Sequence, residues 1–159
     1  MALQFGTDSP LTITAGALAS AANRSSAAVS VSTTANITQI LLNIAVLTTT
    51  VAPLGNKQVV VYGYKSEDGV NYEGSSSVID NVDGTDKALT AIGLPSNLIW
   101  LGTIQLNQNS TTAVTVKKVF ELVSAFGCVP VKWGIVLYND SGTALGATVT
   151  ATYREGYYN

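Results

Sequence analysis

Three aspartates recur in the stretch DNVDGTD, at Asp80, Asp83 and Asp86. Closely spaced oxygen ligands around a glycine are typical of calcium loops, which place ligands at positions 1, 3 and 5 and a closing glutamate at position 12. The spacing here differs from that pattern, and Ile92 falls near the closing position. The stretch therefore favours a solvated turn, with a weak cation site made of the three aspartates as the alternative.

A second acidic group consists of Glu67, Asp68 and Glu73. Glycoside hydrolysis requires at least a pair of carboxylates. However, the Asp-Gly pair in this group predicts a tight hairpin turn between a strand at 57–66 and a partner strand at 70–74. Carboxylates at an exposed hairpin tip are not desolvated, so they lack the raised pKa of a catalytic acid. We interpret the group as part of a turn.

The chain has 159 residues, no histidine and one cysteine, Cys128. These counts exclude nucleophilic systems that need a histidine, zinc sites made of His and Cys, and an intrachain disulfide. Cys128 stands between apolar residues in FGCVPV, and no charged residue adjoins it in sequence to lower its pKa, which favours a buried, unreactive thiol. We expect no enzymatic activity and no cofactor.

Three tyrosines surround the predicted hairpin. Alternation along the strand places Tyr62 and Tyr64 on one face, and Tyr72 lies just beyond the turn. If the three rings are exposed, they form a platform on which sugars can stack. Packing between neighbouring strands of the same protein is the simpler interpretation.

Both ends of the chain carry apolar or aromatic residues. Residues 1–10 are predicted to form an extended N-terminal arm in which Leu3 and Phe5 alternate with polar residues. The chain closes with Tyr157 and Tyr158. Tyrosine is enriched at protein interfaces because its ring is apolar and its hydroxyl tolerates water. We expect these four side chains to contact neighbouring subunits, with packing on their own domain as the alternative for the tyrosines.

The composition is apolar and poor in charge. Hydrophobic residues make up 47% of the chain and charged residues 11%, against roughly 25% charged residues in an average domain. The net charge is −2 and no basic patch is visible, so we expect no nucleic-acid partner. The most apolar run, residues 40–47, is too short to cross a bilayer, so we expect no membrane contact.

Period-two alternation predicts short strands at regular intervals along the chain. The expected strands are at 11–14, 27–33, 36–50, 57–66, 70–74, 98–108, 113–118, 131–139 and 145–155. Residues 119–127 instead show helical spacing, and Gly127 suits the end of a helix. This pattern predicts an all-β fold, a β-sandwich or jelly roll of eight or more strands with at most one short helix near 119–127. Residues 11–159 are expected to form a single β-sandwich domain after the arm.

The large aromatic residues and the glycines within strands predict details of the core. We expect Trp100, Trp133 and Phe126 to be its largest side chains. Glycines beside aromatic or apolar residues in three strands predict bulges or close backbone approach. They are Gly63, Gly102 and Gly134.

The C-terminal third contains VFELVSAFG followed by PVKWGIVLYNDSGTALGATVTATY. This order of a short helix ending near glycine, a Pro–Trp strand, a turn with Asn and Ser-Gly, and a final strand resembles the closing segment of small β-sandwich structural proteins of tailed bacteriophages. Many of these are capsid decoration (cement) proteins. The resemblance covers about residues 98–159 and implies a jelly-roll-like domain without catalytic residues.

The resemblance also implies partners and a location. A decoration protein is a homo-oligomer, often a trimer, that docks on the major capsid protein at the outer surface of the virion. It is made in the host cytoplasm. The alternative is a tail or fibre module that binds host-surface glycans, with Tyr62, Tyr64 and Tyr72 as the contacts.

Overall fold

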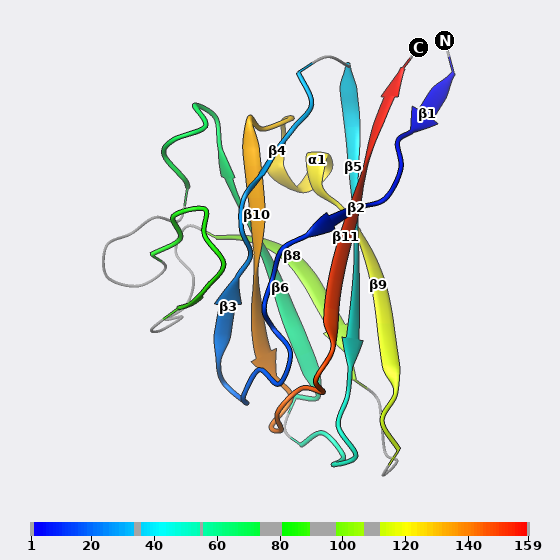
Figure 1. The fold of residues 1–159 in the computed structure, drawn as a ribbon, viewed down its shortest axis with the longest axis vertical. Coiled ribbons are helices and arrows are strands. Elements are labelled where there is room, and N and C mark those ends of the chain that lie inside the picture. Colours follow the sequence, from blue (N-terminus) through cyan, green and yellow to red (C-terminus); the bar gives the residue numbers. More distant parts are fainter. Residues whose placement is uncertain are drawn as a thin grey trace.

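The computed structural model of the chain describes residues 2–33, 36–54, 56–73, 81–89, 98–106 and 112–158. In these residues, eleven strands form two antiparallel sheets packed face to face, with one short helix near one end between them (Figure 1). The predicted all-β, sandwich-like fold is confirmed.

Sheet A contains the two ends of the chain. Its strands run in the order β1-β11-β5-β9, and β2 pairs with β11 on the same side as β1. The strands are β1 (Leu3–Phe5), β2 (Ser9–Leu11), β5 (Ile37–Leu47), β9 (Thr115–Glu121) and β11 (Val149–Tyr158). The predicted N-terminal arm therefore lies along the edge of its own sheet.

Sheet B is built around β10. Its order is β7-β3-β10-β6-β8, and β4 pairs with β10 beside β3. The strands are β3 (Asn23–Ser25), β4 (Val29–Ser30), β6 (Gln58–Ser66), β7 (Lys87–Leu89), β8 (Ile99–Gln105) and β10 (Lys132–Asp140).

The main core lies between the sheets because one face of each long strand is apolar. On β5, Ile40, Leu42, Ile44 and Val46 are fully buried, as the alternation predicts. Sheet B supplies the opposing layer with Val59, Val61, Ile104, Trp133, Ile135 and Leu137. Each such side chain contributes roughly 1.5–3 kcal/mol by leaving water, so this double layer dominates the stability of the fold.

A second, smaller core lies on the outer face of sheet B. Tyr64 and Val136 point away from the main core, and Val82 and Leu89 of the segment 81–89 cover them. This segment therefore adds a partial third layer to the sandwich.

The predicted helix is confirmed but is shorter than expected. Helix α1 covers Leu122–Phe126 and ends at Gly127, whose φ of 72° is the left-handed conformation that favours glycine. Glu121 caps its first turn by accepting hydrogen bonds from backbone amides. The preceding residues 119–121 belong to β9 because they pair with β5.

Several predictions of strands are wrong in extent. Residues 27–33 form a strand only at Val29–Ser30, whereas Asn23–Ser25 form a strand that alternation did not predict. Residues 70–73 do not form the predicted hairpin partner. The carboxylate of Asp68 binds the backbone amides there and closes a turn instead.

Trp133 and Phe126 are buried as predicted, but Trp100 is 63% exposed, so its assignment to the core is wrong. The cause is a bulge in β8, where Tyr62 pairs with Trp100 and Val61 pairs with Gly102. Leu101 is the extra residue, and its side chain packs on the main core. Trp100 consequently projects from the opposite face, and the prediction of a bulge at Gly102 is confirmed.

The other two glycines mark close approach. A Cβ atom on Gly134 would lie 2.3 Å from the ring of Tyr64, its partner across the strand pair. A Cβ atom on Gly63 would lie 2.5 Å from the ring of Phe126. Each glycine therefore leaves the space that a buried aromatic ring occupies.

We predict that Gly134→Ala destabilises the protein by about 1–3 kcal/mol through overpacking, measured by urea unfolding. Gly6→Ala is the matched control because a Cβ atom there would be 3.7 Å from its nearest neighbour, an ordinary contact. Equal unfolding free energies for the two variants would contradict the packing of Tyr64 on Gly134.

Candidate functional site

The two ends of the chain lie side by side at the edge of sheet A (Figure 1). Strand β1 pairs with the end of β11, placing Leu3 opposite Tyr158 and Phe5 opposite Gly156. Leu3 is 38%, Phe5 41% and Tyr158 46% exposed. The structure thus brings together three of the four residues that the sequence predicted at a subunit interface.

These side chains lie on the outer face of sheet A. A Cβ atom on Gly156 would meet the ring of Phe5 and the side chain of Gln39. Gln39 precedes Ile40, which points into the core, so Gln39 and Phe5 face outward. Leu3 stands two residues before Phe5 and shares its face.

The same outer face carries an open groove of about 410 Å³. It is lined by Asp8, Leu41, Asn43, Lys117, Val119 and Arg154. Val119 is 57% exposed although it lies on a strand. Arg154 pairs with Asp8, with its Nη2 2.9 Å from Oδ2, and this hydrogen-bonded contact lowers the pKa of Asp8. The groove therefore combines the apolar side chains of Leu41 and Val119 with polar and charged ones, including the ion pair on its wall.

Tyr157 differs from the other three predicted contacts. It lies opposite Gln4, so it points to the other face of sheet A, and it is only half-buried. It lines a polar hollow of about 330 Å³ together with Gly6, Thr7, Ser9, Ser32, Ile37, Tyr153 and Glu155. Tyr157 thus packs among residues of its own domain.

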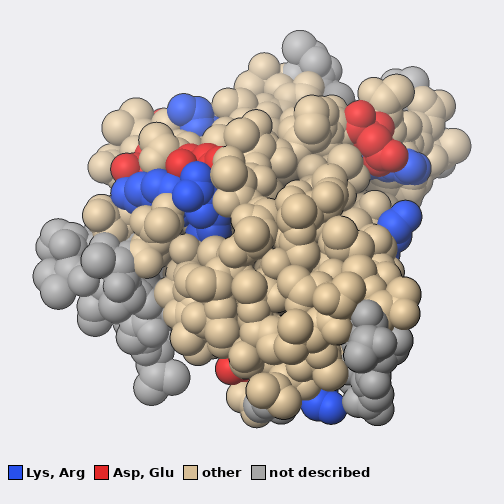
Figure 2. Space-filling view, turned by 60° about the horizontal axis from the view of Figure 1, so that its bottom comes forward, with Lys and Arg blue, Asp and Glu red and all other residues tan. Residues whose placement is uncertain are grey.

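The surface charge is sparse. Figure 2 shows one side of the molecule, where acidic and basic side chains lie in small groups and most of the surface is neither. This distribution agrees with the 11% charged residues of the sequence. Apolar and neutral polar contacts therefore have more influence on binding here than long-range attraction between charges.

The predicted row of exposed tyrosines does not exist, because Tyr64 is fully buried. Its hydroxyl donates a hydrogen bond of 2.7 Å to the carbonyl of Ser26, and burial raises its pKa. Its ring meets that of Tyr72 edge-to-face, with centroids 5.5 Å apart. Tyr62 and Tyr72 are half-buried. Packing within the domain is thus the role of Tyr64, and it cannot touch a glycan.

Sequence reasoning missed Trp100 as a surface residue. Its neighbours in LIWLG are apolar on both sides, so alternation gives no sign of exposure. Gly102, two residues later, was the available signal, since a glycine inside a strand can mark a bulge. The bulge sets the large indole beside Tyr62 on the outer face of sheet B.

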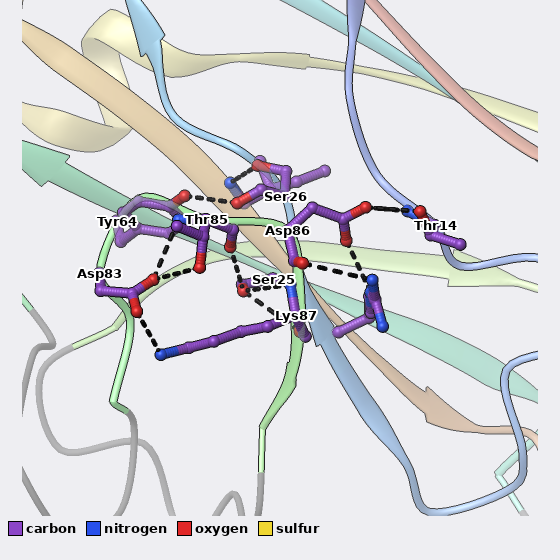
Figure 3. Close-up of polar contacts among 10 residues, drawn as sticks. Thr14, Ser25, Ser26, Tyr64, Asp83, Thr85, Asp86 and Lys87 are labelled. Carbon is purple, nitrogen blue, oxygen red and sulfur yellow. Dashed lines mark hydrogen bonds and ion pairs between the residues drawn. The ribbon is translucent and has the colours of Figure 1, made fainter.

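The aspartates of the calcium-like stretch are used by the protein itself (Figure 3). Asp83 lies 2.7 Å from the ammonium of Lys87, and Asp86 lies 2.6 Å from the guanidinium of Arg24. Asp86 also accepts a hydrogen bond of 2.9 Å from the backbone of Thr14. Asp80 lies outside the described residues. Because the two described carboxylates bind different partners, they do not converge on one cation. Asp86 fastens the segment 81–89 to the sandwich through Arg24 and Thr14, whereas Asp83 binds Lys87 within the segment.

Electrostatics in this cluster favour the ionised carboxylates. Partial burial raises the pKa of Asp83, but hydrogen bonds from Lys87 and Thr85 outweigh burial and hold this pKa at about 2. Partial burial also raises the pKa of Asp86, and hydrogen bonds from Arg24 and Thr14 again produce a net decrease. Both groups therefore stay charged at neutral pH.

A cluster of Lys65, Glu67 and Cys128 forms beside the turn. Lys65 Nζ lies 2.8 Å from Glu67 and 3.2 Å from the sulfur of Cys128, and the thiol donates to Glu67 at 3.0 Å. Cys128 is half-buried, so the expectation of a buried thiol is wrong, and its charged neighbours come from a segment distant in sequence. The hydrogen bond to Glu67 and, secondarily, burial raise the pKa of Cys128 despite the opposing effect of Lys65. The thiol therefore remains protonated at neutral pH.

Neither a metal centre nor a membrane-spanning helix is found in the part of the chain that the structure describes. Within it, no group of three or more His, Cys, Asp or Glu side chains is placed to hold a metal ion, and no helix is long and apolar enough to cross a bilayer. No family model, curated protein or solved structure matches the chain. The outer face of sheet A, with Leu3, Phe5, Tyr158 and the groove, is thus the leading candidate site on its geometry alone.

We predict that Asp86→Asn destabilises the protein at about pH 7 by about 1–3 kcal/mol, because it removes the charged partner of Arg24. The pKa of Asp86 is lower in the folded than in the unfolded chain, so its contribution is complete above roughly pH 4 and is lost as the pH falls through the folded-state pKa. Urea unfolding at several pH values should show the difference from the unmodified protein shrinking as the pH falls below about 4. Asp8→Asn, at an exposed ion pair, should change little, and a difference for Asp86→Asn that is independent of pH would count against this electrostatic role.

We also predict that Glu67→Gln accelerates the reaction of Cys128 with iodoacetamide several-fold near neutral pH. Without the carboxylate, the pKa of the thiol falls, because Lys65 still stabilises the thiolate. Glu73→Gln is the control, since Glu73 lies 3.8 Å from Lys65 and has no hydrogen bond to the thiol. A rate for Glu67→Gln equal to that of the control would refute the assigned cluster.

Proposed function

We propose that this protein is a structural subunit that assembles through the outer face of sheet A. The observation that carries the proposal is the exposed apolar patch of Leu3, Phe5 and Tyr158, which shares the outer face of sheet A with the groove beside Val119. Contiguous apolar surface rimmed by polar groups is typical of protein interfaces. Tyr and Phe are also enriched in interface cores.

The fold holds the patch in place, which favours a preformed assembly surface over a mobile arm. Its residues come from β1 and β11, which are paired by backbone hydrogen bonds, so a partner meets a preformed surface. A preformed surface loses less conformational entropy on binding than a free arm would. The groove wall adds the Asp8–Arg154 pair, which can fix the orientation of a partner through polar contacts.

The more specific proposal is a phage capsid decoration (cement) protein. It is supported by the resemblance of about residues 98–159 to the closing segment of such proteins. Residues that carry the resemblance form α1, β10 and β11, and β11 in turn holds β1 in place. The proposed protein is not an enzyme, forms a homo-oligomer, most often a trimer, and docks on the major capsid protein at the virion surface after synthesis in the host cytoplasm.

Its mechanism would be mechanical. Each copy buries apolar area on neighbouring subunits and ties them together, and each Å² removed from water contributes roughly 25 cal/mol before the costs of association. Many copies on one shell add their contributions. Such a lattice of contacts raises the resistance of the shell to internal pressure.

We predict that the protein elutes from size exclusion as an oligomer, with a mass by light scattering of three chains. The paired substitution of Phe5→Ser and Tyr158→Ser should shift it to the monomer, because it places hydroxyls in the apolar patch. Val131→Ser is the control, since Val131 is similarly exposed, at 47%, and lies outside sheet A. A monomeric unmodified protein, or an unchanged mass for the double variant, would count against assembly through this face.

The same variants test docking on a shell. Added to capsids of the encoding phage from which the protein is missing, the unmodified protein should bind and raise the temperature at which the shells open. The double variant should do neither, whereas Val131→Ser should do both. Equal protection by all three proteins would overturn the decoration role of the patch.

A further inference from the structure

A second surface, on the outer face of sheet B, combines aromatic rings with fixed side-chain amides. Tyr62 on β6 stands opposite Trp100 on β8. Tyr138 on β10 stands opposite Val60, two residues from Tyr62 and therefore on the same face. Trp100 is 63% exposed, and Tyr62 and Tyr138 are half-buried. We name Trp100, Tyr62 and Tyr138 the aromatic platform.

A row of polar side chains borders the platform. Gln58 stands opposite Gln105 on one side and Asp140 on the other, two residues along β6 from Val60. The amide of Gln105 donates to Gln58 at 3.1 Å, and Gln58 donates to Asp140 at 3.0 Å. Asn56 donates to the same Asp140 oxygen at 2.7 Å. We name these four side chains the amide row.

The platform and the row belong to one continuous surface. Tyr138 and Asp140 stand two residues apart on β10 and share a face, opposite Val60 and Gln58 of β6, so the platform leads directly into the row. Three neighbouring strands span about 10 Å across a sheet, roughly the length of two linked sugar rings. The hydrogen bonds within the row hold the amides in one orientation before any ligand arrives, so little side-chain entropy remains to be lost.

The chemical groups on this surface indicate which class of ligand it can bind. Aromatic rings offer flat apolar area to the C–H faces of a sugar ring, and amides and a carboxylate offer donors and acceptors to its hydroxyls. A single-stranded nucleic acid also stacks on aromatic rings but needs a positively charged groove. The platform and the row contain no Lys or Arg, and Asp140 would repel phosphates. We propose that the aromatic platform and the amide row together bind a neutral oligosaccharide chain.

This site is independent of the proposed assembly face. The platform lies on sheet B, whereas Leu3, Phe5 and Tyr158 lie on sheet A, so substitutions on one surface leave the other intact. A decoration protein that carries this site would present a sugar-binding surface outward while sheet A contacts the shell. The two proposals can therefore fail separately.

The test is native gel electrophoresis of the full chain in gels containing soluble neutral polysaccharides: mannan, galactomannan, hydroxyethylcellulose or dextran. The unmodified protein is expected to be retarded by at least one of them. Trp100→Ala should weaken this binding at least about tenfold, as expected for the loss of one stacking ring. Trp100→Phe, which keeps a stacking ring, should retain part of it.

Controls separate loss of the site from loss of the fold. Val131→Ser removes an exposed apolar side chain outside both the platform and the assembly face and should leave retardation unchanged. Because Trp100 is largely exposed, Trp100→Ala should unfold at the same urea concentration as the unmodified protein. Gln58→Ala should also reduce retardation, since Gln58 links both halves of the amide row.

Two results would overturn the proposal. One is the absence of retardation by all four neutral polysaccharides. The other is retardation that persists unchanged in Trp100→Ala. If Trp100→Ala instead changes the oligomeric mass, the platform is a protein interface and the sugar site is refuted.

Discussion

The pairing of β11 with strands on both of its sides is the constraint on which the rest of the surface depends. On one side it follows β5 from Val149 to Tyr157, and on the other it holds β1 and β2. Backbone groups in a sheet edge must find partners or face water, and the N-terminal strands supply those partners. The last strand of the chain thereby fixes the first, and the apolar side chains of both ends come to lie on one outer face.

The core and the outer faces are set by small backbone features as much as by apolar periodicity. Gly134 and Gly63 leave space for the rings of Tyr64 and Phe126, which pack against the backbone of sheet B. The bulge at Leu101, in contrast, turns the side chain of Trp100 away from the core. One added residue in a strand therefore moves one of the two tryptophans of the molecule from the expected core to a candidate binding surface.

The few charged residues act mainly within the domain. Arg24 binds Asp86 of the segment 81–89 and fastens this segment over the second core, whereas Lys87 binds Asp83 within the segment. Lys65 similarly ties Glu67 and Cys128 together beside the turn. Carboxylates engaged in this way are poor candidates for metal binding or acid catalysis. Apolar and neutral polar groups dominate the surface that remains, and both proposed sites accordingly consist mainly of aromatic, aliphatic and amide groups.

The sequence by itself determined the class of fold, the long strands and the helix. Alternation over β5 identified Ile40, Leu42, Ile44 and Val46 as one buried face, because the period of a strand is a local property. The tertiary structure alone decided that Tyr64 is buried, that Trp100 is exposed and that Lys65 lies beside Cys128. Each of these outcomes depends on a segment distant in sequence or on a register shift: the cover of Tyr64 comes from 81–89, and a bulge reverses the side on which Trp100 projects. Local pattern fixes which residues alternate, but only the packing of remote segments decides which face of each sheet remains open to a partner.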